Sequence, residues 1–165
     1  MRAWAFLVFL AITATPAAAE EKRTRVSLGY AFSHYLEEGG GNAPVGAYFS
    51  VASAGRKVGF EADVAYHRDS EEIFGDTIVV NTLTAGVGPR FELGSGKARP
   101  FLHVLGALRH DRIEGESNTA FGGMAGVGVD IPAGRVFVRL GSDFQMFFDE
   151  GTNLKTLRLN AGISF

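Results

Sequence analysis

Apolar and polar or small residues alternate along much of the chain, in short segments separated by turn-forming residues. Between Val26 and Ser33, valine, leucine, tyrosine and phenylalanine occupy every second position, with serine, glycine and alanine between them. A period of two is typical of a β-strand with one apolar face. The pattern predicts an all-β fold with eight strands, at Arg25–Tyr35, Val45–Ala52, Val58–His67, Ile78–Phe91, Arg99–Arg109, Thr119–Ile131, Arg135–Phe148 and Lys155–Phe165.

Two kinds of connection alternate between these predicted strands. The links SAGRK, ELGSGKA and PAGR are short, whereas LEEGGGNAP, RDSEEIFGDT, HDRIEGES and DEGTN are longer or more polar. Short turns on one side and longer loops on the other are the layout of an up-and-down barrel in the outer membrane, whose short turns are periplasmic. We therefore expect an eight-stranded antiparallel up-and-down transmembrane β-barrel.

Acidic residues collect in the longer links, and we expect these links to form a solvated outer rim. A role in bridging divalent ions or lipopolysaccharide is the alternative for these acids. The short turns carry basic residues instead. The rim acids are Glu37, Glu38, Asp69, Glu71, Glu72, Asp76, Asp111, Glu114, Glu116, Asp149 and Glu150.

The two faces of the strands differ in charge, which predicts their orientation. A soluble barrel places apolar residues inside, whereas a membrane barrel places them against lipid. Here one face has almost no charge over a continuous band and needs an apolar medium. The other combines glycines with acids and arginines of roughly balanced charge, as a narrow, filled interior requires. We expect an interior salt-bridge cluster of Glu61, Asp63, Arg90, Asp130, Arg139, Asp143 and Arg158.

Two features of this pattern leave alternatives open. Phe101, Leu105 and Phe137 share the parity of inward residues, so either a bulge resets the register or apolar side chains also fill the interior. The charged cluster could instead be the constriction of a narrow channel, although eight strands leave an interior that side chains can fill.

Aromatic residues are expected at two levels along the barrel, as in interface girdles. The outer level contains Phe32, Tyr66, Phe121 and Phe148, and the inner level contains Phe91 and Phe165.

The N-terminal segment has the features of a secretory signal peptide. Arg2 precedes an apolar run from Ala3 to Ile12, and small residues follow at Ala17–Ala19. The apolar run is shorter than the roughly 20 residues of a membrane-spanning helix. We expect cleavage after Ala19, which leaves residues 20–165 as one barrel domain; an N-terminal membrane anchor is the alternative.

Candidate chemistry changes this interpretation little. The chain has no cysteine and a net charge of −2, which favours neither disulfides nor nucleic-acid binding. The histidines His34, His67, His103 and His110 lack metal-ligand spacing. We therefore predict no catalytic residue, no metal, no cofactor and no enzymatic activity.

Ala85–Leu93, Lys97–Leu108 and the ending LRLNAGISF resemble the small outer-membrane barrel family of the OmpX, Ail and OmpA transmembrane-domain type. The resemblance implies a monomer in the outer-membrane lipid with a structural or surface role, and loops that could bind a host factor, a surface polymer or a lipid headgroup. It also implies that Ile163 and Phe165 form a signal for the barrel-assembly machinery. A narrow porin-like channel and a soluble periplasmic ligand-binding barrel are the alternatives.

Overall fold

The computed structural model describes residues 24–36, 41–43, 45–53, 57–73, 76–94, 97–113, 116–149 and 152–165. The predicted signal peptide lies outside these residues and stays a prediction. Within the described residues, no helix is long and apolar enough to cross a membrane.

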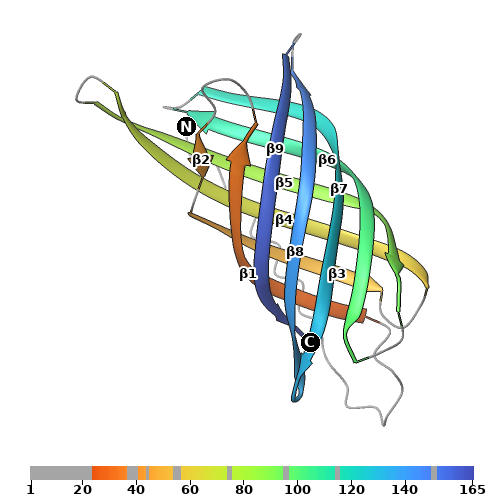
Figure 1. Ribbon diagram of the computed structural model, residues 1–165. Coiled ribbons are helices and arrows are strands. Elements are labelled where there is room, and N and C mark those ends of the chain that lie inside the picture. Colours follow the sequence, from red (N-terminus) through yellow and green to blue (C-terminus); the bar gives the residue numbers. More distant parts are fainter. Residues whose placement is uncertain are drawn as a thin grey trace, which may run out of the picture.

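Eight long antiparallel strands form a closed barrel (Figure 1). Each strand pairs with its neighbours in the chain, and β1 pairs with β9 to close the barrel, as the sequence predicted. Among the described strands, the short β2 pairs with the end of β1 alone. The strands are β1 (Thr24–Tyr35), β2 (Asn42–Ala43), β3 (Val45–Ser53), β4 (Val58–Ile73), β5 (Asp76–Glu92), β6 (Arg99–Ile113), β7 (Glu116–Ala133), β8 (Val136–Asp149) and β9 (Thr152–Ser164).

The register between β5 and β6 decides between a bulge and an apolar filling of the interior as the reason why apolar residues occur at inward-facing positions. Val87 pairs with Gly106 and Arg90 with His103, so the register is the same on both sides of Pro89. No bulge therefore resets these two strands. Phe101 and Leu105 point inward and are buried, which means that apolar side chains occupy part of the interior.

Most strands extend beyond their predicted boundaries at the outer end, which we define as the end with the β4–β5 and β6–β7 hairpins. β4 continues to Ile73 instead of ending at His67, and β6 continues to Ile113. The predicted long links between β4 and β5 and between β6 and β7 are therefore mostly strand, with two residues between the strands. The sequence pattern missed these extensions because, where water reaches both faces of a strand, apolar and polar residues need not alternate.

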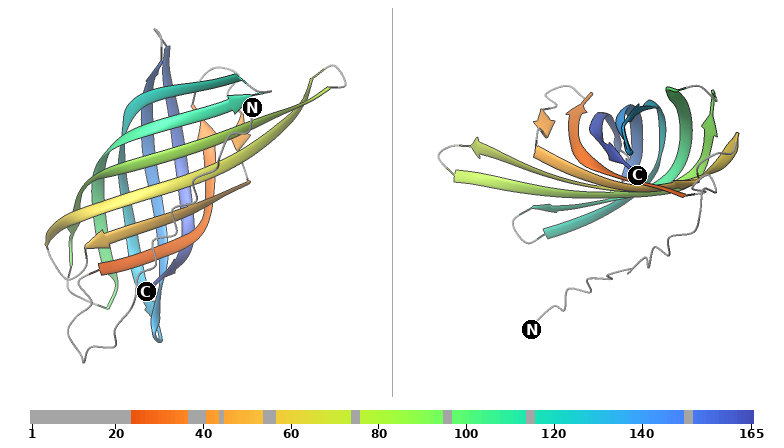
Figure 2. Two further views of the ribbon diagram at one scale, coloured as in Figure 1. Left: turned by 180° about the vertical axis from the view of Figure 1, so that it is seen from behind. Right: turned by 90° about the horizontal axis from the view of Figure 1, so that it is seen from below.

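The β4–β5 hairpin projects beyond its neighbours. β3 begins at Val45, opposite Arg68, so the following residues of β4 pair only with β5 among the described strands. β5 has 17 residues, whereas a tilted strand needs about 9–11 to cross a bilayer. Figures 1 and 2 show the two strands, in yellow and light green, extending past the barrel wall.

Apolar side chains cover the outside of the barrel, and charged side chains lie inside it. Leu28, Phe60 and Val127 are 47%, 68% and 60% exposed, and Val26 is half-buried, whereas Glu61 and Arg139 are each 2% exposed. Such an inversion requires apolar surroundings, as for a transmembrane barrel.

Two layers of side chains fill the inner and middle parts of the interior. Charged residues occupy the inner half of the barrel, and an apolar cluster lies next to them on the outer side. The cluster consists of Leu105, Ala107, Ala120, Met124 and Phe147, with Leu154 packed against it.

Candidate functional site

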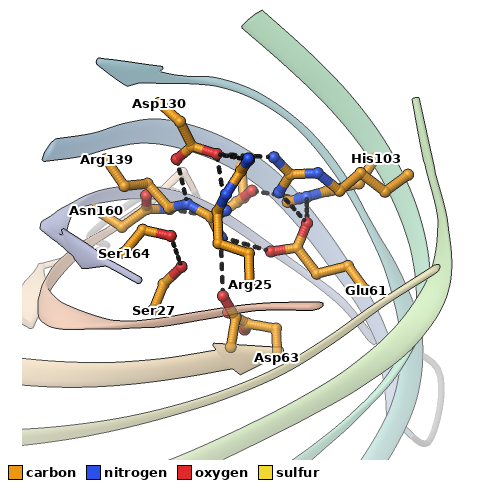
Figure 3. Close-up of polar contacts among 12 residues, drawn as sticks. Arg25, Ser27, Glu61, Asp63, His103, Asp130, Arg139, Asn160 and Ser164 are labelled. Atoms are coloured by element: carbon orange, nitrogen blue, oxygen red, sulfur yellow. Dashed lines mark hydrogen bonds and ion pairs between the residues drawn. The ribbon is translucent and has the colours of Figure 1, made fainter. Parts of the chain in front are cut away.

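The charged interior residues form one continuous network, which we call the luminal network. It consists of Arg25, Glu61, Asp63, Arg90, Glu92, His103, Asp130, Arg139, Asp143 and Arg158. Ser50 and Asn160 add hydrogen bonds from β3 and β9, so all eight barrel strands contribute. Figure 3 shows Glu61, Asp130 and Arg139 among the residues that point toward one another inside the barrel. The structure thus brings together all seven residues that the sequence placed in an interior cluster.

Asp130 on β7 is held by three guanidinium groups. Its Oδ2 accepts from Arg25 Nη1 at 2.7 Å, from Arg90 Nη2 at 3.0 Å and from Arg139 Nη2 at 3.1 Å. Its Oδ1 accepts from Arg139 Nε at 2.8 Å. Asp130 is fully buried, and three cations compensate for the loss of water around its charge.

Glu61 on β4 joins this group to the opposite wall. Its Oε1 accepts from Arg139 Nη1 at 3.0 Å, while its Oε2 accepts from Arg90 Nη1 at 3.0 Å. Arg90 and Arg139 thus each connect Glu61 to Asp130, across the lumen from β4 to β7. Charge-assisted hydrogen bonds of this kind are the stronger ones in proteins.

Arg158 on β9 links the two remaining acids. Its Nη1 donates to Asp63 at 2.7 Å and its Nε to Asp143 Oδ2 at 2.8 Å, and its Nη2 lies 2.8 Å from the same oxygen of Asp143 in an ion pair. Asp143 also accepts from Asn160 Nδ2 at 2.9 Å. Asp63, by contrast, has Arg158 as its one hydrogen-bonding partner among the described residues.

His103 on β6 connects the two halves of the network. Its Nδ1 lies 3.1 Å from Glu61 Oε2, and its Nε2 lies 2.7 Å from Asp143 Oδ1. A carboxylate only accepts hydrogen bonds, so both contacts are satisfied when both ring nitrogens carry a proton. The imidazolium then supplies a fifth positive charge beside four arginines and five carboxylates.

Sequence reasoning did not place His103, Arg25 or Glu92 in the cluster. His103 lies within an apolar segment and lacks metal-ligand spacing, so its inward parity, shared with Phe101, was the one available signal. Arg25 begins its strand, where an end residue is hard to assign to either face. Phe101 also belongs to the site, because Arg90 and Arg139 stack over its ring with the guanidinium carbons 3.6 and 4.9 Å from the ring centre.

Glycine at position 126 makes room for this arrangement. Gly126 faces inward on β7, and an added Cβ would overlap Asp143 Oδ1 and His103 Nε2. The glycine-rich segment of β7 therefore serves the narrow interior, as expected from the strand pattern.

The described residues of the luminal network leave almost no free space between them. The cavity lined by Tyr48, Glu61, His103, Arg139 and Arg158 has a volume of about 10 Å³, enough for about one water molecule. No group of three or more potential metal ligands occurs among the residues that the structure describes. The arrangement can hold side chains together and exclude solvent.

The comparisons with known proteins agree with this inverted architecture. Residues 4–165 match the family model described as the outer membrane protein beta-barrel domain. The chain belongs to this family. It is a barrel of the bacterial outer membrane, so the alternative of a soluble periplasmic ligand-binding barrel is wrong.

Solved structures with the same fold have low sequence identity to this chain. Neisserial surface protein A is 14% identical, with a TM-score of 0.69 over 86% of this chain and 95% of that one. The Ail protein of Yersinia pestis, in complex with the heparin analogue sucrose octasulfate, is 18% identical, with a TM-score of 0.60 over 86% of this chain and 97% of that one. No curated protein sequence matches the chain.

A smaller polar cluster lies near the outer end of the lumen. Arg109 Nε donates to Asp111 Oδ2 at 2.7 Å and Arg109 Nη2 to the Tyr35 hydroxyl at 3.3 Å, while the Thr82 hydroxyl donates to Asp111 Oδ1. The prediction that Asp111 is a solvated rim acid is therefore wrong, because the residue is paired and half-buried. Arg109 lies on the same strand, two residues before Asp111, whereas Thr82 lies on the neighbouring strand β5, and a linear pattern does not reveal this second contact.

The two residues predicted to signal assembly lie at the inner end. Ile163 pairs with Leu28 and Val138, and its side chain is exposed on the lipid-facing side. Phe165 is also exposed, and its backbone N–H and carbonyl both bond to Val26.

Proposed function

We propose that this protein is a closed, non-conducting membrane scaffold whose outer hairpins form the surface that contacts other molecules. The observation that carries the first part is the luminal network, which joins residues of all eight barrel strands around a cavity of about 10 Å³. The proposal assigns no catalytic residue.

An ion crossing the lumen would have to separate buried ion pairs. Arg139 and Arg90 bridge Glu61 and Asp130, and Arg158 bridges Asp63 and Asp143. Leaving a buried charge in such a group without any partner costs about 3–5 kcal/mol. A narrow channel, the competing function, would need several of these pairs to open at once.

Conductance in planar lipid bilayers tests the closed lumen. We expect no current steps from the unmodified barrel. The double variant Glu61→Ala/Arg139→Ala keeps the net charge but removes side chains from the middle of the lumen, and we expect it to conduct. Lys57→Ala/Lys97→Ala, at exposed positions next to the inner turns, serves as the control. Steps from the unmodified barrel as large as those of the double variant would disprove closure.

The charge of the outer hairpins guides the choice of partner. Asp69, Glu116 and Asp149 lie near the outer strand ends, and the adjoining residues of the sequence include further acids. The Ail structure contains a sulfated polyanion. We propose that the acidic hairpins of this chain instead favour cationic or neutral partners, since like charges repel. Retention on a heparin column at physiological salt would contradict this part.

We also propose that the barrel is inserted as a monomer and that Ile163 and Phe165 are read by the assembly machinery. The β1–β9 pairing leaves no barrel strand with a free edge along the wall, which supports the monomer. Native mass spectrometry of the barrel released from lipid nanodiscs tests the oligomeric state, and a dimer signal independent of protein concentration would contradict it.

A further inference from the structure

Three polar residues lie side by side on the lipid-facing side of the barrel. Arg68 on β4 pairs with Asn81 on β5, and Asn81 pairs with Arg112 on β6. Both arginines are exposed and Asn81 is half-buried. Because side chains at directly paired positions point to the same face of a sheet, the three form one row of hydrogen-bond donors, which we call the Arg–Asn–Arg row.

The row lies at the outer boundary of the apolar band. The next outward-facing residues toward the inner end are Tyr66, Leu83 and His110. Below them, Val64, Val87 and Leu108 are exposed apolar residues on the same three strands. Side chains just above a hydrocarbon layer face the phosphate level of the lipid headgroups.

The side chain of Asn81 is oriented by its neighbour. The hydroxyl of Tyr66 donates a hydrogen bond to Asn81 Oδ1 at 2.6 Å. The carbonyl oxygen of the amide is thus occupied, and the NH₂ group remains as a donor between the two arginines. Tyr66 itself is a residue type common at membrane interfaces.

Neither arginine of the row has a hydrogen bond or an ion pair among the described residues. Neighbouring strands are about 4.8 Å apart, so the Cα atoms of Arg68 and Arg112 are separated by about 10 Å. Two long side chains at this spacing can converge on one group above Asn81. An anion there would relieve the repulsion between the two positive charges, and guanidinium groups match the oxygen geometry of phosphate.

We infer that the Arg–Asn–Arg row binds the phosphate of a lipid headgroup in the outer leaflet. The position of the row selects a lipid over a free anion, since Tyr66 and the apolar residues below it would contact the glycerol and acyl parts of the same molecule. The site lies on the outside of the barrel and does not depend on whether the lumen is closed.

The test compares two lipids that differ only in the phosphate. The full chain is placed in phosphatidylcholine nanodiscs with dioleoyl phosphatidic acid or with dioleoylglycerol, and retained lipid is measured by native mass spectrometry. We expect retention of phosphatidic acid alone. Arg68→Gln/Arg112→Gln should weaken it roughly 10- to 30-fold, from about 1 kcal/mol per basic residue near a membrane surface.

Lys97→Gln/Arg135→Gln removes the same charge at the inner turns and should leave retention unchanged. Tyr66→Phe keeps both arginines but frees the amide of Asn81, and an intermediate loss is expected. A gel-shift assay verifies that each variant is folded. Equal retention by both double variants would overturn the proposal. So would displacement of phosphatidic acid by an equal concentration of inorganic phosphate, which would identify a free anion as the ligand.

Discussion

Arg158 is the buried cation whose loss should destabilise the barrel most. It is 1% exposed and is the one hydrogen-bonding partner of Asp63 among the described residues. In an Arg158→Met variant, Asp143 would keep its contacts with His103 and Asn160. Asp63, itself 4% exposed, would keep none and would be a buried, uncompensated charge.

The structure sets the size of the expected effect. A buried charge that loses its partner costs about 3–5 kcal/mol, and we expect this loss of unfolding free energy for Arg158→Met. Arg139→Met should cost only about 1–3 kcal/mol, as for hydrogen bonds to groups that keep other partners. Asp130 would still contact Arg25 and Arg90, and Glu61 would still contact Arg90.

A second substitution tests the mechanism and not merely the magnitude. Asp63→Asn removes the charge that Arg158→Met leaves without a partner, so the double variant should be more stable than the sum of the single effects predicts. We expect a coupling energy of about 1.5–3 kcal/mol, within the range measured for residues in contact.

Unfolding in urea can be followed by far-UV circular dichroism in lipid vesicles and by the gel shift of unboiled samples. The chain has a single tryptophan, Trp4, in the predicted signal peptide, so tryptophan fluorescence is not a probe of the mature barrel. Equal losses for Arg158→Met and Arg139→Met, or additivity in the double variant, would refute the reasoning.

Three further predictions concern other parts of the molecule. Nitrogen-15 spectra of His103 at neutral pH should show both ring nitrogens protonated; the signal of a neutral tautomer would contradict the paired contacts. Gly126→Ala should destabilise the barrel by about 1–3 kcal/mol through overpacking. Gly106→Ala, where an added Cβ would make an ordinary contact with the Val87 carbonyl oxygen at 3.9 Å, should change stability by less than about 0.5 kcal/mol in the same urea titration. Phe165→Ser should reduce the amount of folded barrel in the outer membrane without changing refolding in vitro. Phe148 is also exposed, so Phe148→Ser serves as the control. Equal amounts of the two variants in the membrane would argue against a signal at Phe165.

The barrel and the inward position of its charges were predictable because both follow from a period of two. Glu61 and Asp63 mark the polar face of their strand as the interior one. The acids and arginines on the other strands balance these charges and so indicate which face of each strand is inside. The contacts themselves were not predictable. Arg158 is 95 residues from Asp63 in the sequence, and such pairings depend on the closure of the barrel and on side-chain reach.

The outer boundaries were the weakest part of the prediction, for a physical reason. An alternating pattern arises where one face meets lipid and the other meets the lumen, and it disappears where water surrounds both. The continuation of β4 and β5 beyond Arg68 is therefore invisible in the pattern, although their pairing persists to Ile73 and Asp76. The Arg–Asn–Arg row is not evident in the sequence for a related reason, since the pattern places Arg68 in a loop.

The closed circuit of strands and the projecting hairpin should differ in how their amide hydrogens exchange with solvent. Along the wall, every strand is flanked by two others, including β1 between β3 and β9, so no wall amide can exchange by detachment of a terminal strand. The β4–β5 extension has one inter-strand ladder and can separate without disturbing the wall. Deuterium should therefore enter the hairpin through local opening and the wall only when the whole barrel unfolds.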